Sequence, residues 1–417
     1  MSWCATPYDE PLLHLRDRLK MRAEGKGEQP MTMAPCRHFG DCGGCSLQHL
    51  PYWQQLEQKQ ERIENTLSEA GFNEAIVERI RGMEHPYRYR NKMEFTFSPD
   101  GGLGLHRPGR FDSIIHLEEC YLCSEEMETV LRGVQNWARA LGLPGYNKHT
   151  HQGFLRHLIV RQSGRNGDLM IAIMTTDSRS YPEALADLKE RLVNSGLPIA
   201  SLLWGLNTDP GDKARSEEAV KVLHGRPFIH DEIAGFSYEL FLDTFFQVNS
   251  VQAEILVEKL LEWYEVPKPP LTLDLFCGVG TLSLPLAQST PTGQVVGIEV
   301  VPAAVRAARE NAERNEMTNL AFHESDVRRG IPRVIEDWGK PGAIILDPPR
   351  SGAGGKVMRR IARTGMDRVL YVSCNPVTLV HDVAEMAPFG YGIARVTPID
   401  MFPQTEHVES VCLIERK

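Results

Sequence analysis

One cysteine of the chain stands where a nucleophile could work. Cys374 lies in the segment VLYVSCNP, directly after an apolar run with the character of a buried strand. A buried cysteine is most often a small apolar packing residue, but a side chain at the carboxyl end of a strand in an α/β sheet faces the ligand crevice. Glu409, in the segment MFPQTEHVES, is a carboxylate that could take up a proton in the same site.

A thiolate and a carboxylate suit methyl transfer to C5 of a pyrimidine. Uracil C5 is too weak a nucleophile to take a methyl group unaided. Addition of a thiolate to C6 makes an enolate whose C5 can attack a methyl sulfonium, so that one difficult step becomes two easier ones. A base must then remove the C5 proton before the thiol can leave. This chemistry requires a cysteine beside the cofactor and a carboxylate within reach.

A loop suited to such a cofactor follows the apolar segment LTLDLF. In DLFCGVGT, Gly278 and Gly280 allow a tight turn and a close approach of the backbone to a ligand. The third glycine of a dinucleotide-binding loop is missing, and the acidic Asp274 opens the motif. Glu299 ends the next strand, where a carboxylate can accept hydrogen bonds from both ribose hydroxyls. These residues suit an adenosine without phosphates.

Two further acidic residues follow strands of the same region. Asp326, in HESDVRR, is placed to meet the edge of an adenine, and Asp347 opens the motif DPPR after the strand AIILD. A lone glycine turn is more often structural than ligand-binding, but here four features stand in register on successive strands. The sequence therefore predicts a cofactor site at the carboxyl edge of the sheet.

A second kind of chemistry is indicated by the cysteines. Cys36, Cys42 and Cys45 crowd into ten positions, and Cys120 or Cys123 could supply a fourth thiolate. Soft sulfur ligands select zinc or an iron–sulfur cluster. The spacing differs from that of radical enzymes, in which three cysteines leave one iron open, so a closed four-thiolate site is favoured. Zinc and unliganded thiols are the alternatives.

The elements that must hold these motifs follow from the pattern of apolar residues. Beyond about residue 250, strands, loops and helices alternate, which predicts a doubly wound, mostly parallel α/β sheet over 241–417. Between about 87 and 240, alternating segments bounded by Gly, Asp, Asn and Pro predict antiparallel strands with one helix near 181–195.

The residues before these strands predict less regular structure. Residues 1–35 are interpreted as a poorly ordered tail with one short helix around Leu12–Met21. An amphipathic helix is expected over 53–70, where it could pack on the catalytic part. The chain is thus divided into the tail, a cluster-binding α+β domain over 36–240 that recognises RNA, and the α/β domain.

Composition indicates an ordinary folded protein. The chain has 417 residues, of which 42% are hydrophobic and 24% charged, with a formal net charge of −9. That charge argues against a protein that coats nucleic acid non-specifically, but a local basic face suffices for an RNA enzyme. Without a long apolar run or a secretory leader, the sequence predicts a cytoplasmic protein with no membrane span and no obligatory protein partner.

Cations and aromatic residues gather in one stretch of the central region. The segment Tyr87–Lys92, YRYRNK, mixes aromatic rings, which can stack on splayed bases, with cations, which can contact phosphates. A solvated charged surface explains the same stretch equally well. The wider basic stretch around this segment contains Arg79, Arg81, Arg88, Arg90, Lys92, Arg107 and Arg110.

The combined motifs LYVSCNP, MFPQTEHVE, DPPR and FFQVN resemble the RNA uracil-5 methyltransferase family, and DLFCGVGT resembles motif I of class I methyltransferases. The resemblance covers most of 36–417. It implies a Rossmann-like class I domain in which Cys374 is the nucleophile and Glu409 the general base. The contacts with S-adenosylmethionine would come from Gln247, Phe276, Gly278, Glu299, Asp326 and Asp347.

The same resemblance bears on the metal and on the RNA. In relatives with this insertion, CGGC followed by Gln48 and His49 accompanies a [4Fe–4S] cluster, and Cys120 aligns as its fourth ligand. Such relatives mostly modify 23S ribosomal RNA, which is the favoured substrate. The T-loop uridine of transfer RNA is the alternative. Only 35 residues precede Cys36, too few for the small RNA-binding barrel of many relatives.

Three other functions share some of these features. An RNA cytosine-5 methyltransferase also uses a cysteine, but it usually has a second one just after the proline pair, where this chain reads DPPR. An amino-group methyltransferase grips its substrate with an aromatic residue where Arg350 stands. A non-catalytic RNA-binding or iron–sulfur scaffold would have no need of the Cys374–Glu409 pair. Uracil-5 methylation is therefore favoured.

Overall fold

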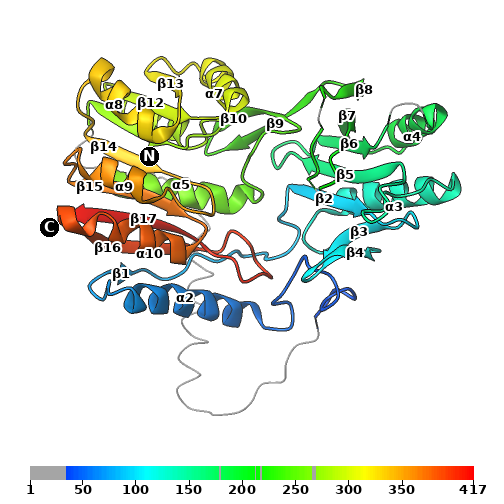
Figure 1. The fold of residues 1–417 in the computed structure, drawn as a ribbon, viewed down its shortest axis with the longest axis horizontal. Coiled ribbons are helices and arrows are strands. Elements are labelled where there is room, and N and C mark those ends of the chain that lie inside the picture. Colours follow the sequence, from blue (N-terminus) through cyan, green and yellow to red (C-terminus); the bar gives the residue numbers. More distant parts are fainter. Residues whose placement is uncertain (1–33, 178–179, 212, 217, 265–268) are drawn as a thin grey trace, which may run out of the picture.

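The computed structural model describes residues 34–177, 180–211, 213–216, 218–264 and 269–417. Its strands form an eight-stranded sheet, a seven-stranded sheet and a two-stranded ribbon. In Figure 1 the two large sheets lie side by side, each with its own helices, and the ribbon lies beside both. The short helix expected around Leu12–Met21, like nearly all of the predicted tail, lies outside the described residues.

The eight-stranded sheet confirms the predicted α/β architecture. In spatial order its strands are β1 (Ile76–Val77), β16 (Tyr391–Ile399), β17 (Glu409–Arg416), β15 (Arg368–Ser373), β14 (Ala343–Leu346), β11 (Leu271–Leu275), β12 (Gln294–Glu299) and β13 (Leu320–Glu324). Neighbours pair in parallel except where β17 runs antiparallel to both β15 and β16. The sheet is therefore mixed but mostly parallel.

Helices cover both faces of this sheet, as alternating strands and helices require. They are α5 (Ser250–Tyr264), α6 (Ser283–Ser289), α7 (Pro302–Arg314), α8 (Val327–Trp338), α9 (Gly355–Ala362), α10 (Pro376–Ala384) and the short 3₁₀ helix η2 (Ala387–Phe389). Successive strand residues enter different cores: Leu370 packs with α5 and α6, whereas Val369 and Tyr371 pack with α8, α9 and α10. No helix in the described parts of the chain has the length and apolar character needed to cross a bilayer.

The seven-stranded sheet is largely antiparallel, as predicted, but it contains one parallel pair. Its order is β4 (Arg110–His116), β3 (Leu103–Arg107), β2 (Lys92–Phe97), β5 (Leu155–Gln162), β6 (Leu169–Thr175), β7 (Ile199–Leu206) and β8 (Lys221–Gly225). β6 and β7 are parallel because helix α4 (Pro182–Val193) forms a crossover between them. The uninterrupted apolar run LMIAIM of β6, which the structure buries completely, was the sequence signal for this arrangement.

A second helix of this region, α3 (Glu125–Ala140), was missed by the sequence analysis. Ser124 caps it by accepting a hydrogen bond from the backbone NH of Met127 at 3.2 Å. Three glutamates occupy its first turn, where their negative charges interact favourably with the positive end of the helix dipole. Its apolar stripe, which includes Val134 and Trp137, is buried against the sheet. These capping and charge signals were present in the sequence.

The helix expected over 53–70 is α2 (Tyr52–Glu69), and it packs beside the other sheet. Its apolar residues Leu56, Ile63 and Leu67 are buried in the core shared with α8, α9 and α10. Strand β1 then pairs in parallel with β16 at the edge of the eight-stranded sheet. Figure 1 shows α2 and β1 alongside β16 and α10. A segment that precedes the seven-stranded sheet in sequence therefore completes the eight-stranded one.

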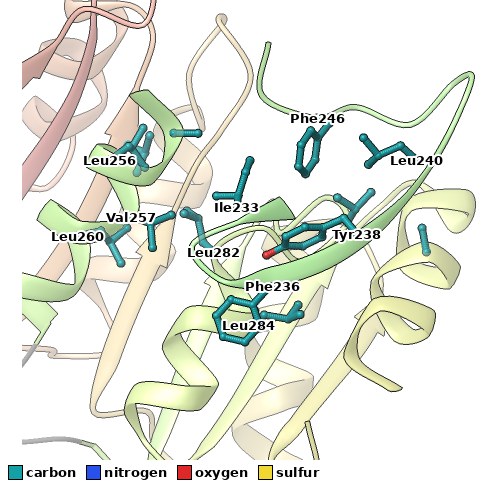
Figure 2. Packing of buried hydrophobic residues seen from close by; sticks show 14 of the residues in the cluster. Ile233, Phe236, Tyr238, Leu240, Phe246, Leu256, Val257, Leu260, Leu282 and Leu284 are labelled. Carbon is teal, nitrogen blue, oxygen red and sulfur yellow. The ribbon is translucent and has the colours of Figure 1, made fainter. Parts of the chain in front are cut away.

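The two-stranded ribbon of β9 (Phe228–Ile233) and β10 (Phe236–Phe241) joins the two large sheets. β9 packs on β6, β7 and α5, and β10 packs on α7. Figure 2 shows Ile233, Phe236 and Tyr238 of this ribbon among leucines of α5 and α6. Burial of this apolar surface holds both sheets together next to the candidate site.

Candidate active site

The pairing of β15 with β17 places the predicted nucleophile and base on neighbouring strands. Ser373, the last residue of β15, pairs with Ser410 of β17 in antiparallel register. Cys374 directly follows Ser373 and Glu409 directly precedes Ser410, so the two residues lie at neighbouring strand ends at the carboxyl edge of β15. Cys374 is half-buried, whereas Glu409 is buried, with 6% of its surface exposed.

Both groups are shifted toward their protonated forms. Burial, together with the negative charges of Glu409 and Asp347, raises the pKa of the Cys374 thiol to about 11. Burial also raises the pKa of Glu409 to about 8, with the charge of Asp347 adding to the effect. These shifts indicate an acidic, water-poor site, and groups with such shifts are common in catalytic sites.

The DPPR loop is tied to the cysteine loop by hydrogen bonds. The carbonyl oxygen of Arg350 accepts from Asn375 Nδ2 and from Thr378 Oγ1, each at 3.4 Å. Asn375 also caps α10 by accepting from the backbone NH of Val377. The Arg350 guanidinium lies 3.5 Å from Nδ1 of His407, two residues before Glu409. Arg350 thus supplies positive charge beside the site, and this charge lowers the pKa of Cys374 against the effect of burial.

The glycine loop after β11 has the conformation that its sequence predicted. Phe276, Gly278 and Gly280 all have positive φ, at 62°, 54° and 86°. A Cβ at Gly280 would come within 2.9 Å of Leu284, so the helix start packs closely against the loop. Phe276, a bulky residue with positive φ, stores strain of the kind that gathers at ligand sites.

Asp274 opens this loop as a fully buried carboxylate. Its Oδ2 accepts a short hydrogen bond from Ser283 Oγ, whereas Oδ1 is buried and has no hydrogen-bond partner among the described residues. Burial raises its pKa to about 7. An acceptor left in this state is what a cationic ligand beside the loop would satisfy.

Glu299, at the end of β12, is held by backbone donors. Its Oε1 accepts from the NH groups of Val300 and Val301 at 2.8 and 2.9 Å, and Oε2 accepts from Gly278 NH at 3.2 Å. The carboxylate therefore joins two adjacent strand ends. This is the position at which a ribose would be bound in a doubly wound sheet.

The other predicted cofactor residues lie at three further strand or loop positions. Asp347 follows β14, and burial raises its pKa to about 7. Asp326 caps α8 by accepting from the backbone NH of Arg329 at 3.3 Å, which gives this exposed residue a structural role as well. Gln247 is half-buried, and its backbone carbonyl oxygen accepts a hydrogen bond from Asn91 Nδ2 at 2.9 Å.

A groove of about 860 Å³ lies along the seven-stranded sheet and is also lined by residues from 43–46, from 244–248 and from the loop that precedes Glu409. Its walls carry several cations, and Phe245 beside them is 73% exposed. The lining residues are Gly43, Gly44, Cys45, Ser46, Arg90, Lys92, Met93, Glu94, Leu105, His106, Arg107, Pro108, Gly109, Arg161, Thr244, Phe245, Phe246, Val248, Thr405, Glu406 and His407. A basic groove with an exposed aromatic ring suits a single-stranded segment of RNA.

Four cations of the basic stretch predicted for RNA contact divide into two groups. Arg90, Lys92 and Arg107 line the groove, as an RNA-binding role requires. Arg88 instead holds the cysteine-bearing segment, because its Nη1 donates to Glu128 at 2.7 Å and to two backbone carbonyls. Tyr89 is 8% exposed and donates its hydroxyl hydrogen to Pro403 O at 3.0 Å, so the expectation that it stacks on a base is wrong.

Arg161 was not singled out in the sequence, yet it lines the same groove. It is 3% exposed and donates from Nη2 to the carbonyl oxygen of Thr244 at 2.7 Å. Burial lowers its pKa to about 10, so the guanidinium remains charged at neutral pH. Arg161 lies inside the mostly buried strand β5, and the residues around it in the sequence do not indicate that it faces a groove.

Four of the cysteines face one small cavity beside this groove. They are Cys36, Cys42, Cys45 and Cys120. The backbone NH of Gly44 donates to Cys42 Sγ at 3.4 Å, and Gln48 Nε2 donates to Cys45 Sγ at 3.1 Å. Cys123 is fully buried in the apolar core, and its thiol donates to Cys120 O at 3.5 Å. The geometry thus favours Cys120 over Cys123 as the fourth candidate ligand.

The cavity shared by these cysteines does not by itself form a metal site. No three His, Cys, Asp or Glu side chains of the described residues converge as ligands of one metal ion. Burial raises the pKa of Cys42 to about 11 and of Cys45 to about 12. Raised pKa values of this kind disfavour the thiolate forms when no metal is bound.

Comparisons with known proteins give consistent results. Residues 271–389 match the family model described as a methyltransferase domain. An "Uncharacterized RNA methyltransferase" of Caldanaerobacter subterraneus subsp. tengcongensis is 36% identical over 95% of this chain and 89% of its own. One of Halalkalibacterium halodurans is 35% identical over 92% and 83%. The crystal structure of Pyrococcus abyssi tRNA (uracil-54, C5)-methyltransferase with S-adenosyl-L-homocysteine superposes with a TM-score of 0.72 at 26% identity, covering 90% and 86% of the two chains.

Proposed function

The chain belongs to the family of S-adenosylmethionine-dependent RNA methyltransferases, and from this premise we propose that it methylates C5 of a uridine in folded RNA. The observation that carries the proposal is the pairing of Ser373 with Ser410, which brings Cys374 and Glu409 to neighbouring strand ends at the carboxyl edge of β15. The uracil-5 specificity of the Pyrococcus abyssi enzyme supports it. Cytosine-5 methylation is disfavoured because this chain lacks the second cysteine that such enzymes usually have after the proline pair. Amino-group methylation is disfavoured because it does not require the Cys374–Glu409 pair.

In the proposed mechanism Cys374 acts first. Its thiolate sulfur forms a bond to C6 of the uracil, which makes C5 a carbon nucleophile. S-adenosylmethionine, when bound, supplies the methyl group that C5 takes up. Glu409 then accepts the C5 proton, the C5–C6 double bond re-forms, and the bond between C6 and the sulfur breaks. The raised pKa of Glu409 suits a group that must take and release a proton near neutral pH.

The residues of the glycine loop fit S-adenosylmethionine. The buried Oδ1 of Asp274, which has no partner among the described residues, suits the cationic amino acid part. Gly278 at φ 54° has open space where a Cβ would stand, so the backbone can approach a ligand. Glu299 would bind the ribose hydroxyls, and Asp326 the adenine edge. Phe276, Gln247 and Asp347 complete the set that we propose for this cofactor.

The basic groove would bind the RNA and hold the uridine out of its stack. C5 and C6 must both be accessible, so the target base has to leave a helix or come from a loop. Arg90, Lys92 and Arg107 would contact phosphates, and the exposed Phe245 would stack on a base. We propose 23S ribosomal RNA as the first candidate substrate, on the basis of the cysteine motif. The named target of the Pyrococcus abyssi enzyme makes transfer RNA the second.

We propose a [4Fe–4S] cluster on Cys36, Cys42, Cys45 and Cys120. The shared cavity and the two N–H···S hydrogen bonds support it, since such bonds accompany cluster thiolates. When bound, the cluster would link the segment that contains Cys36, Cys42 and Cys45 to the segment that contains Cys120. A thiolate-ligated cluster also implies a reducing compartment, which supports a cytoplasmic location. Zinc is the alternative.

The experiment that tests this function uses the full chain with S-adenosylmethionine and unmodified 23S ribosomal RNA or transfer RNA. The RNA products are then digested to nucleosides, which are separated and identified by mass spectrometry. We expect 5-methyluridine in one RNA class, and a covalent protein–RNA adduct when the target uridine is replaced by 5-fluorouridine. Formation of 5-methylcytidine or an N-methylated base instead would refute the proposal.

A further inference from the structure

The loop of residues 400–408, here called the base loop, joins β16 to Glu409 at the start of β17. We propose that Gln55 and Gln404 are positioning residues, which clamp the base loop between helix α2 and the cysteine segment and so fix Glu409 over the uracil. The inference rests on the proposed function for the role of Glu409. The clamp itself is defined by hydrogen bonds that do not depend on that function.

Gln404 is the central residue of this clamp. It has a positive φ of 69°, which is uncommon for a residue other than glycine, and it is 1% exposed. A residue keeps such a backbone conformation only where its surroundings enforce it. The loop therefore has one conformation imposed on it by neighbouring elements.

The first neighbour is the segment that follows the predicted cluster ligand Cys45. The backbone NH groups of Ser46 and Leu47 both donate to the carbonyl oxygen of Gln404, at 2.9 and 3.0 Å. Cys45 and Ser46 line the groove together with Thr405 and His407 of the base loop. The cysteine segment and the base loop thus form one continuous wall of the groove.

The second neighbour is helix α2. Gln55 is 1% exposed and bonds Gln404 twice: its Nε2 donates to Gln404 Oε1 at 2.9 Å, and its Oε1 accepts from the Gln404 backbone NH at 3.0 Å. The same Nε2 donates to Leu47 O at 3.1 Å. One buried amide therefore binds both the base loop and the cysteine segment. Removing it would leave several buried groups without partners, which favours movement of the loop.

Other contacts fix the beginning of the base loop. Lys59 of α2 donates to Asp400 at 2.5 Å and to Phe402 O at 3.0 Å. Tyr89 donates to Pro403 O at 3.0 Å. Asp400, Phe402, Pro403 and Gln404 are thus bonded to residues that precede the seven-stranded sheet, whereas the carbonyl oxygen of Met401 accepts from Asn249 Nδ2 at 3.0 Å. The position of Glu409 is set from outside its own sheet as well as by strand pairing.

The test compares Gln55→Met, which keeps the volume but removes the amide, with Gln60→Met on the same helix. Gln60 is also buried, at 7% exposure, but its side chain bonds Glu64, Glu78 and Ile80. Tyr89→Phe, which removes one hydroxyl and no volume, is the second variant. Amide hydrogen exchange over 400–409 is measured on each folded protein, followed by kcat, the KM for RNA and the affinity for S-adenosylmethionine.

We expect faster exchange over 400–409 in Gln55→Met and Tyr89→Phe but not in Gln60→Met. In Gln55→Met, kcat should fall about tenfold with unchanged cofactor affinity, and the covalent RNA adduct should accumulate because proton removal is slowed. Wild-type exchange and wild-type turnover in both loop variants would overturn the proposal. If Gln55→Met does not fold, Tyr89→Phe decides. A wild-type enzyme that makes no 5-methyluridine would refute the function while the exchange result still tests the clamp.

Discussion

The ammonium group of Lys59 lies 2.5 Å from Oδ1 of Asp400, and the two side chains are 2% and 0% exposed. Burial lowers the pKa of Lys59 and raises that of Asp400, and each charge opposes the shift of the other. Tyr52 also donates to Asp400, from its hydroxyl to Oδ2 at 2.8 Å. An ion pair in such surroundings holds its partners in place more than it adds to stability.

Loss of one member of this pair should be costly. Lys59→Met leaves the Asp400 charge buried without its partner, so we expect the free energy of unfolding to fall by about 3–5 kcal/mol. The double variant Lys59→Met/Asp400→Leu should recover most of this loss, because no charge then remains buried. Denaturant titration of both variants measures the difference. Equal stabilities of the single and double variants would contradict the prediction.

Cys374→Ala should abolish methyl transfer and the covalent adduct with 5-fluorouridine RNA. The thiolate has no substitute in the addition to C6, so we expect a loss of at least about a thousandfold in kcat. Adduct formation is read on a denaturing gel. Cys412→Ala, in the core strand β17, serves as the matched control and should still form the adduct. Normal turnover by Cys374→Ala would show that another group attacks the ring.

Glu409→Gln should separate the two halves of the reaction. Cys374 can still add to C6 and the methyl group can still be transferred, but the amide cannot accept the C5 proton. An enzyme–RNA adduct should therefore accumulate with the unmodified substrate and release slowly. Time courses of adduct and of 5-methyluridine measure this partition. Release at the wild-type rate would assign the base to another residue.

The same variant should alter the dependence of stability on pH. The pKa of Glu409 is raised from 4.5 to about 8 in the folded protein. Below about pH 4.5 Glu409 is protonated in both the folded and the unfolded protein, so it does not affect the free energy of unfolding. As the pH rises from about 4.5 to about 8, the unfolded state loses this proton first, and the free energy of unfolding falls. Glu409→Gln should raise the Tm by several degrees at about pH 8.5 and have little effect near pH 4. An equal Tm difference at both pH values would contradict the assigned shift.

Removal of a cysteine ligand should bleach the protein. Anaerobically purified wild-type protein should show broad visible absorption that dithionite bleaches. We expect Cys45→Ser to lose this colour and Cys123→Ser to keep it, because Cys45 lines the shared cavity and Cys123 lies in the apolar core. A colourless wild-type preparation with one bound zinc would instead establish the alternative metal.

The sequence predicted those parts of the site that depend on local pattern. Cys374 and Glu409 stand at strand ends, and Gly278 and Gly280 have the positive φ that glycine favours, so short motifs can predict these positions. Lys59 and Asp400 are 341 residues apart, and a lysine on an amphipathic helix is normally a surface residue. No local pattern shows that this one is buried. The crossover between β6 and β7 was missed because alternation was read as antiparallel pairing throughout.

The placement of α2 and β1 against the eight-stranded sheet also constrains how the chain can reach its native state. β1 pairs with β16, and Ile76 and Val77 meet Arg395 and Val396 only after more than three hundred residues of intervening chain have been made. Contacts of such sequence separation close large loops and slow folding. Until they form, the edge of β16 is open to strands of other molecules. Nascent copies are therefore most exposed to aggregation late in synthesis, and the N-terminal helix and strand protect that edge once they dock.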